Sequence, residues 1–343
     1  MAAPHCETRL PGWGALRRWD DRSSETLPGW RGPAAHTEAV PVMGKDAHMS
    51  QKLDQTVALV TGASSGIGEA TALALAASGA AVAVAARRRD RLEDLAGRIR
   101  GAGGEVQIVE VDITDEVAAR SAVEATVERF GRLDTVVANA GVILLGPVQD
   151  APIAEWQRMV DVNVMGLLYT AHAALPHLLR AASSKPRRVA DLVLISSVAG
   201  RVPRSGSGVY NLTKHGVGAF GEALRQEVTQ QHVRVSLVEP GAVATELASH
   251  NRAEVRESMA ARFQGMERME AEDIADAIAY IVTRPRRVAI NELLIRPDRA
   301  AGLTSSVRQR VAAPESRRAG RTARTTCQAS DDWPMFWCVA DAR

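Results

Sequence analysis

A tyrosine and a lysine four residues apart, Tyr210 and Lys214, are the side chains of this sequence best suited to acid–base chemistry. They begin a stretch with helical spacing, residues 209–231, which places both side chains on one face, one turn apart. A lysine ammonium beside a phenol lowers the pKa of the tyrosine from about 10 towards neutrality. A general acid or base needs such a pKa. The same spacing also arises by chance in helices, so the pair needs a context.

A glycine-rich turn supplies that context. Gly62, Gly66 and Gly68 follow the apolar run 56–61 and precede a segment with helical spacing, residues 69–78. Three glycines let the chain turn tightly and approach a pyrophosphate, while the N–H groups of the following helix point at that anion. The strand before and the helix after the turn predict a dinucleotide site rather than an ordinary loop.

Three consecutive arginines mark the position at which such a site selects its cofactor. Arg87, Arg88 and Arg89 follow the second apolar run, where an acid would bind the ribose 2′-hydroxyl and an arginine a 2′-phosphate. The planar guanidinium suits phosphate, so NADP(H) is predicted over NAD(H), with Arg88 or Arg87 as the contact. The alternative is a solvated charge run. Asp90 is expected to cap the next helix.

The elements that must position these groups alternate along the chain. Apolar runs predict strands, and amphipathic segments between them predict helices. Because the runs are almost continuously apolar, they fit strands buried on both faces by helices. We therefore predict one α/β domain with a doubly wound, seven-stranded parallel sheet. The expected strands are 56–61, 81–86, 106–111, 134–138, 189–195, 233–238 and 288–295, and the expected helices are 69–78, 90–100, 115–130, 152–182, 209–231 and 271–282.

Composition and charge limit the class of protein. Of the 343 residues 46% are hydrophobic and 24% charged, and 42 basic against 40 acidic side chains leave a net charge of only +2. These values exclude a disordered chain and give no reason to expect a nucleic-acid partner. No apolar stretch is long enough for a membrane span. We expect the α/β domain at 51–300 between poorly ordered segments at 1–50 and 301–343, and a cytoplasmic location, since all three cysteines lie in those segments.

Seven motifs in order give the sequence a family resemblance. They are Gly62, Gly66 and Gly68; Asp112; Asn139, Ala140 and Gly141; Asn163; Ser197; Tyr210 with Lys214; and Pro240, Gly241 and Thr245. With these motifs at the ends of the expected elements, the sequence resembles the single-domain branch of the short-chain dehydrogenase/reductase family, which has the Rossmann fold. The ending 288–297 resembles its bacterial NADP-dependent 3-hydroxy acid and serine dehydrogenases.

The resemblance implies a role for each matched residue. Tyr210 is the proton donor in reduction and the base in oxidation, Lys214 holds the nicotinamide ribose, and Ser197 hydrogen-bonds the substrate carbonyl. Asn163 is expected to interrupt its helix and anchor a water that relays protons to Lys214; a surface asparagine is the alternative. Ser196 is expected to satisfy backbone groups. The implied cofactor contacts are Gly62, Ser64, Ser65, Gly66, Ile67, Gly68, Arg87, Arg88, Asp112, Ile113, Asn139, Ala140, Gly141, Tyr210, Lys214, Pro240, Gly241, Val243 and Thr245.

The resemblance further implies hydride transfer between nicotinamide and the CH–OH or carbonyl carbon of a small polar substrate, in a homo-oligomer, a dimer or tetramer. No metal is expected. Residues 246–270, which we call the lid segment, are expected to contact the substrate and to contain a helix at 253–269. Arg201 and Arg204 could meet a substrate carboxylate or remain ordinary loop arginines. A catalytically silent dinucleotide sensor or scaffold is the alternative function.

Overall fold

The computed structural model describes residues 52–298 and contains the predicted sheet. All neighbouring strands pair in parallel, in the order β3-β2-β1-β4-β5-β6-β7. The strands are β1 (Val57–Thr61), β2 (Ala81–Ala86), β3 (Val106–Glu110), β4 (Thr135–Ala138), β5 (Ala190–Ile195), β6 (Val233–Pro240) and β7 (Glu292–Ile295). The predicted terminal segments, 1–50 and 301–343, lie outside the described residues.

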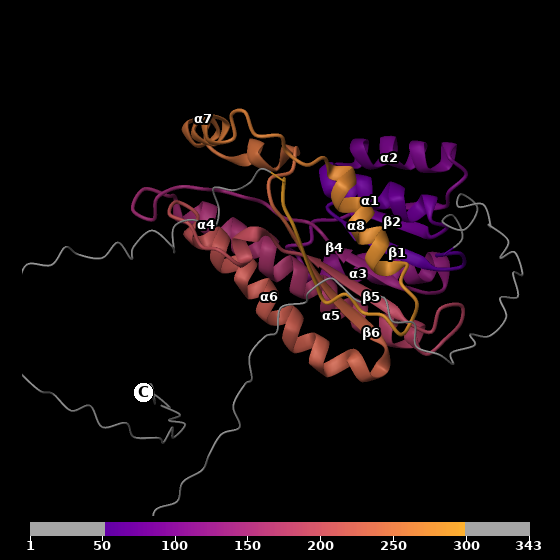
Figure 1. Ribbon diagram of the computed structural model, residues 1–343. Helices are drawn as coiled ribbons and strands as arrows, with labels where there is room; N and C mark the ends of the chain where they lie inside the picture. Colours follow the sequence, from indigo (N-terminus) through magenta and orange to yellow (C-terminus); the bar gives the residue numbers. More distant parts are fainter. Residues whose placement is uncertain (1–51, 299–343) are drawn as a thin grey trace, which may run out of the picture. The chain divides into compact units, whose positions relative to one another are not determined.

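Helices cover both faces of the sheet, as Figure 1 shows. One hydrophobic core lies under α3 (Glu116–Phe130), α5 (Gly166–Ala182) and α6 (Gly208–Val228). A second core lies on the opposite face under α1 (Gly66–Ala77), α2 (Arg89–Gly101) and α8 (Ala271–Val282). Between them the Val, Ala and Leu side chains of β1, β2 and β5 are buried on both faces, which explains their continuous apolar runs. Within residues 52–298, none of these helices is long and apolar enough to cross a bilayer.

The strand order places a topological switch point between β1 and β4. From β1 the chain continues outward to β2 and β3, then returns to place β4 on the other side of β1. In open sheets of this type, ligands bind in the crevice beyond the carboxyl ends of the strands at that point. The fold therefore directs attention to the loops that follow β1, β2, β4, β5 and β6.

Several element boundaries differ from those predicted. The expected helix 152–182 is divided into α4 (Ile153–Val160), a π-helical turn η1 (Asp161–Met165) and α5. The expected strand 288–295 pairs only over β7, since residues 288–291 are irregular. The lid helix, α7, ends at Arg262 instead of residue 269. Asp90 is not the cap of α2: Arg88 occupies that position, and Asp90 lies in the first turn.

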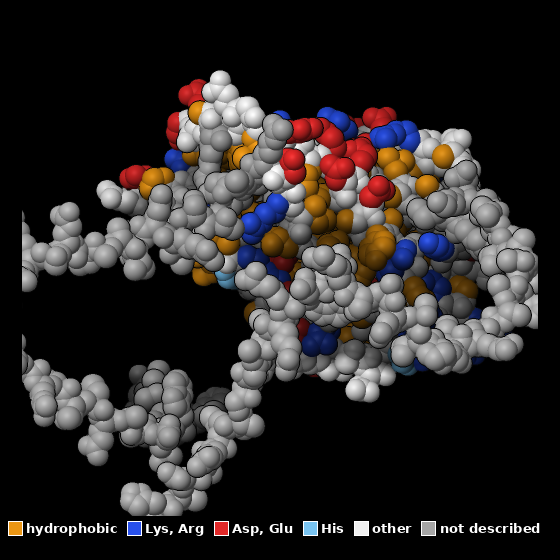
Figure 2. Space-filling view, in the orientation of Figure 1, with side chains coloured by type: hydrophobic (Ala, Val, Ile, Leu, Met, Phe, Trp, Pro, Cys, Tyr) orange, Lys and Arg blue, Asp and Glu red, His pale blue; other side chains and the backbone are white. Residues whose placement is uncertain are grey.

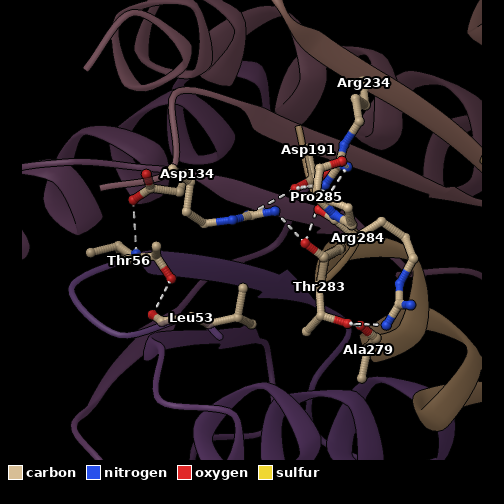
Figure 3. A network of polar contacts seen from close by, with 12 residues as sticks. Leu53, Thr56, Asp134, Asp191, Arg234, Ala279, Thr283, Arg284 and Pro285 are labelled. Carbon is tan, nitrogen blue, oxygen red and sulfur yellow. Dashed lines mark hydrogen bonds and ion pairs between the residues drawn. The ribbon is translucent and has the colours of Figure 1, made fainter. Parts of the chain in front are cut away.

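Buried charges fasten the amino-terminal edge of the sheet, opposite the crevice. The Arg234 guanidinium on β6 donates to both carboxylate oxygens of Asp191 on β5, at 2.7 and 3.0 Å. It also donates to the carbonyl oxygen of Val288 at 2.7 Å, and Arg187 donates to Asp191 at 3.0 Å. Figure 3 shows Arg234 between Asp191 and the chain that follows α8. This cluster joins β5, β6 and the segment before β7 far from the crevice.

The outer surface carries charges of both signs. Figure 2 shows acidic and basic side chains intermixed on the side of α1, α2 and α8. One such pair, Arg98 with Glu69, joins α2 to α1. The mixture agrees with the near-zero net charge and leaves this face without a strong field of one sign.

Candidate functional site

A cavity of about 690 Å³ lies at the carboxyl ends of the strands. It gathers most of the predicted site residues, although they are spread over almost the whole domain. Gly68, Asn163 and Gly241 do not line it. The predicted residues in its wall are Gly62, Ser64, Ser65, Gly66, Ile67, Arg87, Arg88, Asp112, Ile113, Asn139, Ala140, Gly141, Ser197, Tyr210, Lys214, Pro240, Val243 and Thr245.

The glycine turn after β1 is shaped by close backbone contacts. Gly62 has φ +67°, and a Cβ there would lie 2.7 Å from the Cα of Ala140. Gly68 would bring a Cβ within 2.4 Å of the Gly62 carbonyl oxygen, so its absent side chain lets α1 pack onto the turn. Gly66 has φ +56° and begins α1, so the N-terminus of this helix lies at the cavity. The turn can therefore take an anionic group against backbone N–H donors.

Asn139, at the end of β4, supports this turn as well as lining the cavity. Its side-chain amide donates to the carbonyl oxygens of Thr61, at 3.0 Å, and Gly62, at 3.2 Å. Its backbone N–H donates to the Thr61 hydroxyl at 3.1 Å. These bonds fasten β4 to the turn across the switch point. Gly241, by contrast, donates its N–H to the Ile295 carbonyl oxygen at 2.8 Å and fastens β6 to β7.

The predicted arginines stand beside the glycine turn. Arg88 donates to the hydroxyls of Ser64, at 3.0 Å, and Ser65, at 2.8 Å. Arg87 lies 3.6 Å from the Asp112 carboxylate. Partial burial alone would raise the pKa of Asp112, but hydrogen bonds from Thr114 and the charge of Arg87 hold that pKa below its ordinary value. This end of the cavity thus carries two guanidiniums, with Asp112 kept ionised beside Arg87.

Ser197, Tyr210 and Lys214 come together at the other end. The Ser197 hydroxyl, which donates to the Pro240 carbonyl oxygen at 3.4 Å, is close enough to Tyr210 to act on its pKa, and the Lys214 ammonium lies 5.9 Å from the centre of the Tyr210 ring. Lys214 Nζ donates to the Ile195 carbonyl oxygen at 2.8 Å. All three side chains are buried, and they come from the loop after β5 and from the first turns of α6.

Their protonation differs from the prediction. Burial raises the pKa of Tyr210 to about 12, and the nearby Ser197 hydroxyl offsets only part of that rise. Burial lowers the pKa of Lys214 to about 8. The expected lowering of the tyrosine pKa is therefore wrong for the protein alone, because loss of solvation outweighs the attraction between an ammonium and a phenolate. At neutral pH the phenol is protonated.

The neighbouring serine plays the structural part expected of it. Ser196 donates its hydroxyl to the Lys214 carbonyl oxygen at 3.0 Å, which joins β5 to α6. Gly200 allows this close approach, since a Cβ there would lie 2.8 Å from Ser196 Oγ and 2.9 Å from the Lys214 carbonyl oxygen. Gly200 belongs to no pattern of spaced glycines and was therefore not predicted.

Asn163 interrupts its helix, as expected, and is not a surface asparagine. It lies within the π-helical turn η1 and is 1% exposed. Its side chain pairs with both backbone groups of Val142: Oδ1 accepts from the N–H at 2.8 Å, and Nδ2 donates to the carbonyl oxygen at 2.9 Å. Nδ2 also donates to Thr213 Oγ1 at 3.3 Å. Asn163 thus holds the wall-forming chain after β4 against α6.

The lid segment completes the wall. Its first residue, Glu246, lines the cavity beside Arg88, and Met259, Phe263 and Met266 add apolar surface. Figure 1 shows α7 apart from the helices packed on the sheet. Residues 246–270 were predicted as a segment, whereas these individual residues follow no spacing rule and were not.

Arg201 meets a carboxylate of the protein itself. Its Nε donates to both oxygens of buried Glu239, at 2.7 and 2.8 Å, and its Nη2 contacts Glu292. The interpretation of Arg201 as a substrate contact is therefore not supported. The pair joins the loop that carries Ser197 to the end of β6.

Comparisons with known proteins agree with this arrangement. Residues 56–256 match the family described as short chain dehydrogenase. An uncharacterized oxidoreductase of Staphylococcus aureus is 35% identical over 246 residues, which are 71% of this chain and 98% of that protein. The chain therefore belongs to the short-chain dehydrogenase/reductase family, and it is a Rossmann-fold oxidoreductase.

Solved structures agree on the fold and differ in their named substrates. A serine dehydrogenase complexed with NADP+ is similar with a TM-score of 0.64 and 29% identity, over 77% of this chain and 100% of that one. A 3-ketoacyl-ACP reductase from Sinorhizobium meliloti has a TM-score of 0.62 and 35% identity, over 70% of this chain and 97% of that one.

Proposed function

We propose that the protein transfers hydride between NADP(H) and the carbonyl or CH–OH carbon of a small polar substrate, with Tyr210 as the general acid and base. One observation carries the proposal: the glycine turn with its neighbouring arginines and the Ser197–Tyr210–Lys214 cluster line the same cavity of about 690 Å³. The NADP+ in the serine dehydrogenase structure supports the choice of cofactor.

The residues present fit such a cofactor. The cradle between Gly62 and Gly66, which a Cβ would fill, would hold the pyrophosphate at the N-terminus of α1. Arg88 would hold the 2′-phosphate, with Arg87 as the alternative. Asp112, Ile113, Asn139, Ala140 and Gly141 would line the adenosine side, and residues 240–245 the nicotinamide side. When bound, the nicotinamide supplies or accepts the hydride.

The protein's own groups manage the substrate oxygen. In reduction Ser197 donates a hydrogen bond to the carbonyl oxygen, and Tyr210 transfers its proton as negative charge develops there. Burial raises the pKa of Tyr210 to about 12, which keeps the proton available at neutral pH. In oxidation the phenolate takes the proton back, and charged Lys214, 5.9 Å from the ring centre, favours that form. Asn163 keeps the cavity wall in place and anchors the proposed proton-relay water.

Removal of one hydroxyl tests the catalytic assignment. We expect Tyr210→Phe to lower turnover by about 10²–10⁴-fold, the usual contribution of a positioned proton donor, while NADPH affinity changes little. Turnover is measured as NADPH oxidation over a panel of small aldehydes and keto acids, and affinity by NADPH fluorescence. Tyr280→Phe is the matched control, because Tyr280 is exposed on α8. Turnover within tenfold of wild type would overturn the role of Tyr210. NADPH binding without turnover of any panel member would support the sensor or scaffold alternative.

The cofactor preference has its own test. Arg88→Ala should raise the KM for NADPH about tenfold more than that for NADH, near the lower end for a charge-assisted bond because Arg88 is partly exposed. Arg87→Ala and the double variant identify the contact, and Arg89→Ala is the control, since Arg89 pairs with Glu93. An unchanged NADPH:NADH ratio in the double variant would refute the assignment.

We further propose a cytoplasmic homo-oligomer, a dimer or tetramer. Leu212 on α6, Tyr280 on α8 and Leu294 on β7 are exposed apolar side chains that a second copy could cover. Light scattering after gel filtration measures the molar mass, and a monomer at micromolar concentration would exclude the oligomer.

A further inference from the structure

A carboxylate from the lid segment lies on the arginine that the proposed function assigns to the 2′-phosphate. Arg88 Nη1 donates to Glu246 Oε2 at 2.9 Å. The two residues are 158 positions apart in the chain. Arg91, on the next turn of α2, lies 3.7 Å from Glu246 Oε1. Glu246 thus bridges two guanidiniums at the mouth of the cavity.

The same guanidinium also holds the glycine turn. Arg88 Nη2 donates to the hydroxyls of Ser64, at 3.0 Å, and Ser65, at 2.8 Å. Of the groups around Arg88, Glu246 is the only anion within ion-pair distance among the described residues. An arginine has donors and no acceptor, so any second anion must share those donors with Glu246.

A phosphate and a carboxylate compete for such a guanidinium, because both accept the same N–H groups and repel each other. A 2′-phosphate at Arg88 must therefore displace Glu246 or bear its repulsion. Arg91 offers the displaced carboxylate a second partner, so the exchange need not leave Glu246 unpaired.

We propose that Glu246 is a specificity-determining residue of the nucleotide site, because its carboxylate competes with the 2′-phosphate for Arg88 and so limits the preference for NADP(H) over NAD(H). The inference rests on the proposed function, which supplies the 2′-phosphate. It concerns a residue of the lid segment, outside the strand end at which this preference is ordinarily set.

Two nucleotides that differ only by the 2′-phosphate isolate the effect of Glu246 on binding of that phosphate. Calorimetry measures the affinity of the free protein for adenosine 2′,5′-bisphosphate and for adenosine 5′-monophosphate. We expect Glu246→Gln to tighten the bisphosphate about two- to fivefold, the range of an exposed ion pair, and to leave the monophosphate unchanged. Glu246→Ala should act in the same direction. The gain should shrink at high salt, because both partners are partly exposed.

Matched variants separate a failure of this inference from a failure of the proposed site. Glu93→Gln removes the same charge from another exposed pair on α2, with Arg89, and should leave the ratio of the two affinities unchanged. If Arg88→Ala weakens the bisphosphate while Glu246→Gln does not tighten it, the competition is refuted and the site stands. If Arg88→Ala leaves the bisphosphate unaffected, Arg88 does not bind the 2′-phosphate and the competition is refuted. If Arg87→Ala together with Arg88→Ala also leaves it unaffected, the proposed 2′-phosphate site itself is wrong.

Discussion

Two buried ionisable side chains, Tyr210 and Lys214, set the properties of the cavity at the scale of single residues. Their pKa values move in opposite directions, to about 12 and about 8, for one reason: burial penalises whichever form is charged. The protein alone therefore favours a neutral phenol and weakens the hold of the lysine on its proton. A lysine that is charged and buried at neutral pH lowers the free energy of unfolding. Replacing Lys214 therefore tests directly whether it is buried.

Lys214→Met should stabilise the fold at pH 7 by up to about 3 kcal/mol, the equivalent of lowering the lysine pKa from 10.5 to about 8. Between pH 8 and 10.5 the unfolded chain binds more protons at this position than the folded chain, so wild-type stability rises with pH there. The advantage of the variant should shrink over the same interval. Urea unfolding of both proteins at pH 7, 8.5 and 10 measures it, and an advantage that grows with pH would contradict the burial argument.

Local sequence patterns predicted most of the residues that line the cavity. They did not predict which distant residues these side chains contact. Tyr210 and Lys214 lie one helical turn apart, so their proximity follows from spacing alone. The contact between Arg88 and Glu246 joins positions 158 residues apart, and no local periodicity encodes it. The direction of the tyrosine pKa was also mispredicted, because solvation depends on everything that packs around the ring rather than on one neighbour.

At the scale of elements, ion pairs join the loops that carry the reactive groups. Arg201 follows the short helix η2 (Val198–Gly200), and Ser197 caps that helix by accepting from the Ala199 N–H at 3.1 Å. The Arg201 guanidinium then holds buried Glu239 on β6. The loop after β5 is thereby fixed to the end of the neighbouring strand β6, whose Pro240 also lines the cavity.

Arg201→Met should lower the free energy of unfolding by about 2 kcal/mol, since it leaves the buried Glu239 carboxylate without its charged donor. The double variant with Glu239→Gln should recover part of the loss, because no buried charge then remains. Denaturant titration measures both. Arg225→Ala, which breaks a partly exposed pair with Glu222 on α6, is the control and should leave the midpoint nearly unchanged. Equal losses in the single and double variants would count against this account.

Element types were predictable because the sheet is buried on both faces, which forces continuous apolar runs at β1, β2 and β5. The boundaries were less so. The π-turn at Asp161–Met165 contains Asn163, which bonds the backbone of Val142, a tertiary contact that helical periodicity does not contain. Similarly, residues 288–291 are apolar enough for a strand, yet the Val288 carbonyl oxygen is bound by Arg234.

At the scale of the whole molecule, the two ends of the parallel strands have different roles. We call them the carboxyl edge and the amino edge of the sheet. The carboxyl edge carries the cavity, and the amino edge carries Asp191 with its two arginines. Asp191 is fully buried, and Arg234 is 6% exposed. The cluster joins strands that the cavity needs in register, but it contributes no atom to the cavity wall.

Arg234→Met should therefore lower the free energy of unfolding by about 3–5 kcal/mol, the cost of leaving a buried charge with an incomplete set of partners. NADPH affinity measured below the unfolding midpoint should remain that of wild type. Guanidinium titration and fluorescence binding give the two quantities. Arg120→Ala, from an exposed pair on α3, serves as the control. If Arg234→Met kept its stability but lost affinity for NADPH, the Asp191–Arg234 cluster would not be independent of the cavity.

The two edges also decide how the domain should be attached to a surface. Strand β1 begins at the amino edge, immediately after residues 52–56, whereas β7 ends at Ile295, whose carbonyl oxygen binds Gly241 at the cavity edge. A linker joined just before residue 52 would leave a bead or electrode on the side away from the cavity. One joined just after residue 298 would start on the same side of the sheet as the cavity. Immobilisation through the first position should preserve free diffusion to the cavity, and the second would crowd it.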